Sequence, residues 1–189
     1  MIKLNFRLAQ FSDIPTLVEL INQSYREQQG RSWTTEVEYV KGQRINKEQL
    51  KHQLELPNSV LLIGEIDSSK VVTCIGLTFQ SNTVEIGTFC TDPHVQNMKI
   101  GRSVLEYAEQ FALHKVPELD SAIMYVLNVR SELIAYYERR GYIKTGYHEP
   151  YYERRGYIKT GYHEPYPLDA NVGLPLIPIK LIEMKKDLK

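Results

Sequence analysis

Between residues 83 and 103 the chain passes from a predicted strand through a short loop into a predicted helix, and this junction could bind an anion. "TVEIGTFCT" (83–91) is rich in β-branched and aromatic residues, whereas "IGRSVLEYAEQFA" (100–112) places its apolar residues on one helical face. The first turn of a helix presents backbone N–H groups without partners and a partial positive charge, which suit a phosphate group. A strand, a loop and a helix can also be an ordinary connection, and the pattern alone does not decide between the two.

The first half of the chain predicts the elements that must position this junction. Alternating apolar residues over 2–9 predict a strand, and "SDIPTLVELINQSY" (12–25) predicts an amphipathic helix with Ser12 as its N-cap. A second short helix over 47–54 follows, with Asn46 as its N-cap. Three consecutive strands over 59–66, 70–80 and 83–91 predict an antiparallel meander.

The second half of the chain predicts a buried strand over 121–129 and a helix over 131–141, with Ser131 as N-cap and Gly141 at the C-terminal cap. Further strands are predicted at "YIKTGY" (142–147) and at "IKLIEMKKDL" (179–188), with a proline-rich loop between them. This order predicts a mixed α/β sheet with helices on its faces, built as one domain over residues 1–189.

Composition narrows the classes of partner. Lysine plus arginine equals aspartate plus glutamate at 23 each, so no net charge favours nucleic acid or an anionic membrane surface. No apolar run is long enough to span a membrane, and the N-terminus does not resemble a signal peptide. The only cysteines, Cys74 and Cys90, lie in predicted strands and weakly indicate a reducing, cytoplasmic setting. No cluster with ligand spacing predicts a metal.

Two motifs in the right order resemble the GNAT superfamily of acetyl-CoA-dependent N-acetyltransferases, and the similarity covers residues 3–187. "QNMKIG" (96–101) is similar to the family's Q/R-x-x-G-x-G/A loop, with Lys99 in place of the first glycine. "YYERRGY" (136–142) matches the family's aromatic-Tyr-Glu-x-x-Gly-aromatic pattern in full. The resemblance implies a mostly antiparallel sheet of six or seven strands with about four helices on its faces.

The resemblance also implies a cofactor site for acetyl-CoA and roles for two side chains. Glu85 is the implied general base, although it could be an outward residue of a half-solvated strand. Tyr137 is the implied acid that protonates the departing thiolate, with an ordinary phenol pKa of ~10, although a tyrosine at this position could serve only in helix packing. The backbone N–H of Phe89 is the implied oxyanion donor. Residues implied to contact the cofactor are Phe89, Cys90, Thr91, Gln96, Asn97, Met98, Lys99, Ile100, Gly101, Arg102, Ser103 and Asn128.

The acceptor is less defined. In this superfamily the segment holding Trp33, Glu36 and Arg44 covers the acceptor, and these side chains suit a small zwitterionic amine, although surface polarity explains the charges equally well. The function that the resemblance implies is transfer of acetyl to the amine of a small molecule. The alternatives are a non-catalytic module that binds acetyl-CoA and an enzyme that acetylates a protein N-terminus or lysine.

Residues 136–150 and 151–165 are identical, so fifteen residues occur twice in tandem. Two short copies are too few for a stacked repeat. Because the helix-forming residues "SELIA" (131–135) are joined to the first copy, this copy is expected to provide the native helix, and the second copy is expected to be extruded into the loop that follows. In the alternative, residues 157–161 supply the strand. Eight of the thirteen tyrosines lie in the repeat, so a homodimer through this segment is a further prediction.

Overall fold

The computed structural model describes residues 3–26, 34–66, 70–95, 100–150 and 173–189. Its main sheet has seven strands in the order β1-β3-β4-β5-β6-β9-β7, and only the β5–β6 pair is parallel. The strands are β1 (Asn5–Leu8), β3 (Ser59–Ile66), β4 (Lys70–Gln80), β5 (Thr83–Thr91), β6 (Ser121–Leu127), β7 (Ile143–Pro150) and β9 (Lys180–Asp187). Two short strands, β2 (Val40–Lys41) and β8 (Leu174–Pro175), pair separately. The predicted mostly antiparallel sheet is confirmed.

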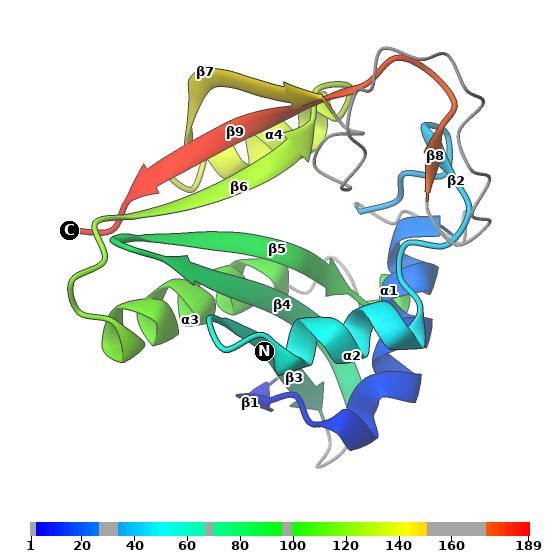
Figure 1. Ribbon diagram of the computed structural model, residues 1–189, viewed down its shortest axis with the longest axis horizontal. Coiled ribbons are helices and arrows are strands. Elements are labelled where there is room, and N and C mark those ends of the chain that lie inside the picture. Colours follow the sequence, from blue (N-terminus) through cyan, green and yellow to red (C-terminus); the bar gives the residue numbers. More distant parts are fainter. Residues whose placement is uncertain (1–2, 27–33, 67–69, 96–99, 151–172) are drawn as a thin grey trace.

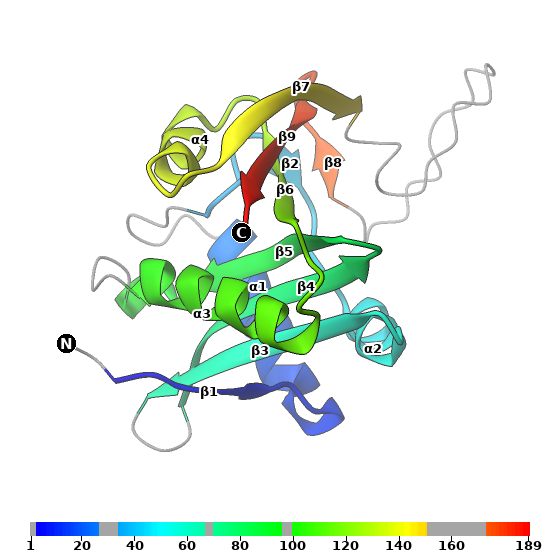
Figure 2. The ribbon, with the colours of Figure 1, turned by 90° about the vertical axis from the view of Figure 1, so that its left-hand side faces the viewer.

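Four α-helices cover the two faces of this sheet (Figures 1 and 2). They are α1 (Ile14–Arg26), α2 (Lys47–Glu55), α3 (Ile100–Lys115) and α4 (Ser131–Glu138). One buried cluster joins α1 and α2 to β3 and β4 through residues such as Leu17, Leu50 and Ile63. A larger cluster on the opposite face joins α3 and α4 to the sheet. Burial of these apolar residues drives the layering.

Of the three N-cap residues predicted from the sequence, one is confirmed by the structure and two are wrong. Asn46 caps α2 as predicted, because its Oδ1 accepts the Gln49 backbone N–H at 2.8 Å. Ser12 is not an N-cap: a 3₁₀ turn begins one residue earlier, and Asp13 Oδ2 accepts the Gln10 backbone N–H at 2.7 Å. Ser131 is likewise the first residue of α4, since the N-cap is the preceding arginine.

The sheet divides into two halves between β5 and β6. These strands pair only from Thr83↔Ser121 to Ile86↔Met124, and beyond this point the rest of β5 pairs with β4 alone. Figure 1 shows β6, β9 and β7 diverging from β5 in the direction of β2 and β8. Residues 87–91 therefore have an edge that β6 does not pair, in the middle of the sheet.

A β-bulge lies on the unpaired part of β5. Cys90 pairs with Cys74 and Gly87 with Gly76, so two residues of β5 oppose the single residue between those partners on β4. Thr88, within the bulge, has a φ of 46°, in the left-handed region. A bulge twists a strand and changes where its side chains point, and this one does so at the edge that faces the gap between the halves.

The first copy of the repeat supplies both the end of α4 and strand β7. Gly141 has a φ of 90°, which permits the turn that ends the helix, and β7 then pairs with β9. In the structure the first copy occupies the edge of β9, and residues 157–161, which the alternative would place there, lie outside the described residues. Residues 151–165 lie outside the described residues, so the extrusion of the second copy stays a prediction.

Candidate active site

A cleft of about 200 Å³ lies between the two halves of the sheet. Its lining comes from the unpaired part of β5, the second half of β6, helix α4 and the segment between α1 and α2. The cleft brings together five residues predicted from the sequence to act at the site: Glu36, Arg44, Glu85, Phe89 and Tyr137. They are spread over about a hundred positions of the chain, and the divergence of β5 from β6 makes the space that they share.

Glu85 and Phe89 lie on β5 and both line the cleft, with Gly87 between them. A Cβ atom added at Gly87 would lie 4.0 Å from Glu85 Oε1 and within 4 Å of nothing else. The carboxylate thus extends over a residue that has no side chain, which leaves room beside it. Ile86 and Thr88 line the cleft as well, so the whole segment 85–89 of the strand borders it.

Tyr137 approaches the same cleft from α4. Its ring makes edge-on contacts with Tyr136 and Tyr142, at centroid distances of 5.3 and 5.9 Å, and only 7% of the residue is exposed. Burial, and then the neighbouring Tyr136, raises the pKa of the Tyr137 hydroxyl above the ordinary phenol value. The expectation of an unperturbed phenol is corrected: the hydroxyl is protonated throughout the physiological range, as an acid requires.

The start of α3 packs against the edge of β5. A Cβ at Gly101 would lie 3.1 Å from the Tyr136 hydroxyl, closer than an ordinary contact, and at ordinary contact distance, 3.8 Å, from the Phe89 ring. Ile100 is buried in the core, whereas Arg102 and Ser103 are exposed on the first turn of the helix. Gln96, Asn97, Met98 and Lys99 lie outside the described residues.

Two other residues of the predicted cofactor edge have side chains in the core. Cys90 is fully buried, with its Sγ 3.4 Å from Cys74 Sγ, and Thr91 Oγ1 lies 3.2 Å from Thr73 Oγ1. Only the backbone of these two residues can therefore meet a ligand at the strand edge. Asn128 does not line the cleft: its Oδ1 accepts the Lys180 backbone N–H at 2.8 Å, which joins β6 to the start of β9.

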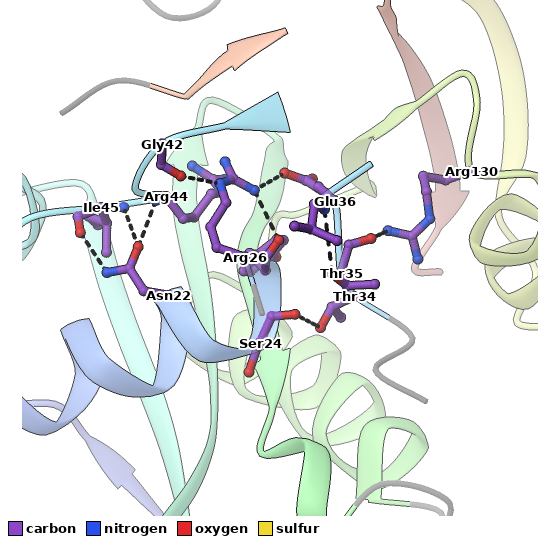
Figure 3. Close-up of polar contacts among 12 residues, drawn as sticks. Asn22, Ser24, Arg26, Thr34, Thr35, Glu36, Gly42, Arg44, Ile45 and Arg130 are labelled. Atoms are coloured by element: carbon purple, nitrogen blue, oxygen red, sulfur yellow. Dashed lines mark hydrogen bonds and ion pairs between the residues drawn. The ribbon is translucent and has the colours of Figure 1, made fainter. Parts of the chain in front are cut away.

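Residues 34–36 bridge the two halves of the sheet (Figure 3). Thr34 Oγ1 donates to the Ser24 carbonyl of α1 at 3.0 Å, and the Thr35 carbonyl accepts a hydrogen bond from Arg130, which precedes α4. Because α1 and α4 belong to opposite halves, this segment links the two halves beside the cleft, which Thr34 and Glu36 line. Arg130 is itself buried and lines the cleft.

Glu36 is already paired within the protein. Its Oε2 lies 2.7 Å from Arg26 Nη1, and their side chains are only 15% and 9% exposed, respectively. Arg26 also donates to the Gly42 carbonyl at 2.8 Å, as Figure 3 shows. The negative charge of Glu36 is therefore compensated before any acceptor binds. Trp33, the aromatic residue expected beside it, lies outside the described residues.

Two residues of the cleft were not anticipated as functional. The hydroxyl of Tyr25 donates to the Phe89 carbonyl at 2.8 Å, which ties α1 to the edge of β5. In the sequence Tyr25 is indistinguishable from the other apolar-face residues of its helix, and nothing distinguishes Arg130, which directly precedes the predicted cap Ser131. Only the long-range contacts of Tyr25 and Arg130 assign them to the cleft.

Two properties of the described residues bear on other classes of function. In the described part of the chain, no group of three or more histidine, cysteine, aspartate or glutamate side chains is placed to hold a metal ion. No helix among these residues is long and apolar enough to cross a membrane.

Comparisons with known proteins agree with this geometry. A model of the acetyltransferase (GNAT) family matches residues 15–142, and no curated protein matches. The ribosomal-protein-S18-alanine N-acetyltransferase of Escherichia coli has a similar structure (12% identity, TM-score 0.68, 99% of this chain and 95% of that one). The PaiA N-acetyltransferase of Thermoplasma acidophilum in complex with coenzyme A also has a similar structure (19% identity, TM-score 0.62, 98% of this chain and 99% of that one). The spermidine/spermine N-acetyltransferase of Vibrio cholerae is similar as well (11% identity, TM-score 0.62, 98% of this chain and 93% of that one). At these identities the likeness shows the fold.

Proposed function

Because the chain belongs to the GNAT family of acetyltransferases, we propose that it transfers the acetyl group of acetyl-CoA to the amine of a small molecule. The observation that carries this proposal is the unpaired edge of β5. Glu85 and Phe89 line one side of the cleft there, and Tyr137 approaches from the other half of the sheet. An extended ligand can add to such an edge as a further strand would.

The residues of the cleft have complementary roles in this reaction. Glu85 removes a proton from the ammonium group of the acceptor, directly or through a water molecule, so that the amine nitrogen can attack the thioester carbonyl carbon. The backbone N–H of Phe89 stabilises the negative charge that develops on the carbonyl oxygen. As the new C–N bond forms, the C–S bond breaks, and Tyr137 gives its proton to the departing thiolate. The nitrogen sheds its remaining extra proton to solvent as the amide forms.

The acceptor side of the cleft favours a small molecule over a protein. Residues 34–36 link the two halves of the sheet beside the cleft, because Thr34 is hydrogen-bonded to Ser24 on one half and Thr35 to Arg130 on the other. The remaining space of about 200 Å³ is small for a cleft that must admit the acceptor and the acetyl group together. The similar Escherichia coli protein acts on a ribosomal protein, so a protein acceptor is the second candidate within the same fold.

Acetyl-CoA binding and turnover test this proposal separately. Calorimetry with the full chain should show acetyl-CoA binding, and thiol release should follow when primary amines are added. Glu85→Gln should lower kcat by about 10²-fold or more without weakening acetyl-CoA binding. Glu55→Gln, which removes an exposed carboxylate of α2, is the matched control and should leave both unchanged.

Binding without turnover across amines, peptides and proteins would identify a non-catalytic module. Failure to bind acetyl-CoA would remove the proposal altogether.

A further inference from the structure

Arg44 is a cation of the cleft whose charge no described residue compensates. It lines the cleft, and its Nε is buried without a hydrogen-bond partner among the residues that the structure describes. The carboxylates of the described residues form no ion pair with it. A guanidinium carries five N–H donors in a planar fork, and a buried N–H without an acceptor is costly. Arg44 is therefore a candidate to bind an anionic group.

Arg44 is nevertheless held in place. Its backbone N–H donates to Asn22 Oδ1 at 2.6 Å, and its guanidinium carbon lies 5.1 Å from the centre of the Tyr25 ring. Tyr25 in turn donates its hydroxyl to the Phe89 carbonyl at 2.8 Å. A cation that stacks on a fixed ring is preorganised, which favours binding of a ligand. Through Tyr25 the guanidinium is placed one side chain away from the strand edge where the acetyl group is transferred.

The charge balance of the cleft narrows the choice of acceptor. Arg26 compensates Glu36 at 2.7 Å, so Glu36 adds no free charge to the space. The base Glu85 faces the same cleft and suits the ammonium group of an acceptor. Arg44 is placed to meet a negative charge on the same molecule. A ligand with one positive and one negative group complements these two side chains.

We propose that the acceptor is an α-amino acid whose carboxylate binds Arg44 while its amine lies at Glu85; this inference rests on the proposed acetyltransferase function. The guanidinium fork matches a carboxylate in a bidentate geometry, and such charge-assisted pairs are the stronger hydrogen bonds in proteins. The small volume of the cleft favours a carboxylate directly next to the amine over one at the end of a long chain. The reaction forms the N-acetyl amino acid and free coenzyme A.

Matched acceptors test the inference with the full chain. The twenty α-amino acids, their carboxamides and the corresponding amines without the carboxylate are assayed with acetyl-CoA by thiol release. At least one amino acid should be acetylated with a kcat/KM roughly 10- to 100-fold above that of its carboxamide. Arg44→Gln should raise the KM for that amino acid by a similar factor, with a small change in kcat, and should leave the KM for the carboxamide within about threefold.

Controls keep the inference separate from folding and from the proposed function. Lys51→Gln removes an exposed cation of α2 and should leave both KM values unchanged. Acetyl-CoA affinity measured by calorimetry shows whether Arg44→Gln is still folded, and Arg44→Lys should restore part of the preference. If amines are acetylated with no preference for the carboxylate, or Arg44→Gln slows every acceptor equally, the inference is wrong and the acetyltransferase function stands. If acetyl-CoA binds but no amino acid is accepted, the inference is also wrong. If acetyl-CoA does not bind, the proposed function itself fails.

Discussion

Replacing Tyr137 by phenylalanine removes the proposed acid and little else. The ring keeps its edge-on contacts with Tyr136 and Tyr142, at 5.3 and 5.9 Å, so the core around it should persist. No hydrogen bond from the Tyr137 hydroxyl to another described residue has to be broken, so we expect a stability change within about 1 kcal/mol. Loss of a general acid lowers turnover by about 10²- to 10⁴-fold, and we therefore expect kcat to fall at least 100-fold while acetyl-CoA binding is kept.

The tandem repeat provides the control for this experiment. Tyr152 holds the same place in the second copy, with identical neighbours in the sequence. Because α4 and β7 are built from the first copy, Tyr152→Phe should leave kcat within about twofold of the unaltered chain.

Thiol release at saturating acetyl-CoA and acceptor measures kcat, and calorimetry measures cofactor binding in each variant. Because burial raises the pKa of Tyr137, the activity of the unaltered chain should show no loss from deprotonation of this hydroxyl up to pH 10. A normal rate in Tyr137→Phe would refute the acid role. If Tyr152→Phe lost the rate instead, the second copy would supply the acid, and the assignment of the native helix to the first copy would be wrong.

The remaining predictions concern stability. Glu109 is largely buried and accepts hydrogen bonds from the Tyr142 hydroxyl at 2.8 Å and from the Lys186 ammonium at 2.6 Å. Lys186→Met should therefore lower the free energy of unfolding, measured in urea, by about 1–3 kcal/mol, and adding Glu109→Gln should recover part of that loss. An unchanged urea midpoint would show that solvent already screens the pair. Arg7 hydrogen bonds lower the pKa of Asp13 below its ordinary 3.8, so the stability from this pair is fully present above pH 3.8 and is lost as pH falls through the folded-state pKa. Asp13→Asn should therefore be less stable by about 0.5–1 kcal/mol at pH 7, and the gap should close in acid; a gap independent of pH would contradict the linkage.

Local patterns anticipated many of the elements. Asn46 caps α2 as predicted, and Gly141 takes the positive φ that ends α4. These features involve residues a few positions apart, whose interactions are the same in any fold that keeps the element. The two misplaced caps, at Ser12 and Ser131, show the limit of this reasoning, because neighbouring residues compete for the same backbone groups.

Only part of the candidate site could be predicted from the sequence. The resemblance to a family implied roles for Glu85, Phe89 and Tyr137, and the structure brings these three residues to one cleft. The pairing of Glu36 with Arg26, and the buried Nε of Arg44 that no described residue pairs, were not predictable, since nothing in the sequence says which cation a given carboxylate will meet.

The amino-acid sequence by itself determined the order of the four helices and of the strands of the main sheet, and its resemblance to a family named the residues that carry the proposed acid and base. Only the tertiary structure decided that Glu36 pairs with Arg26 whereas Arg44 pairs with no described residue, and that residues 34–36 link the two halves of the sheet beside the cleft. The reason is the range of the interactions: Tyr25 and Phe89 are 64 positions apart, and Arg130 and Thr35 are 95 apart. Contacts over such separations form only once burial of the apolar faces has packed α1 on its half of the sheet and brought the two halves together.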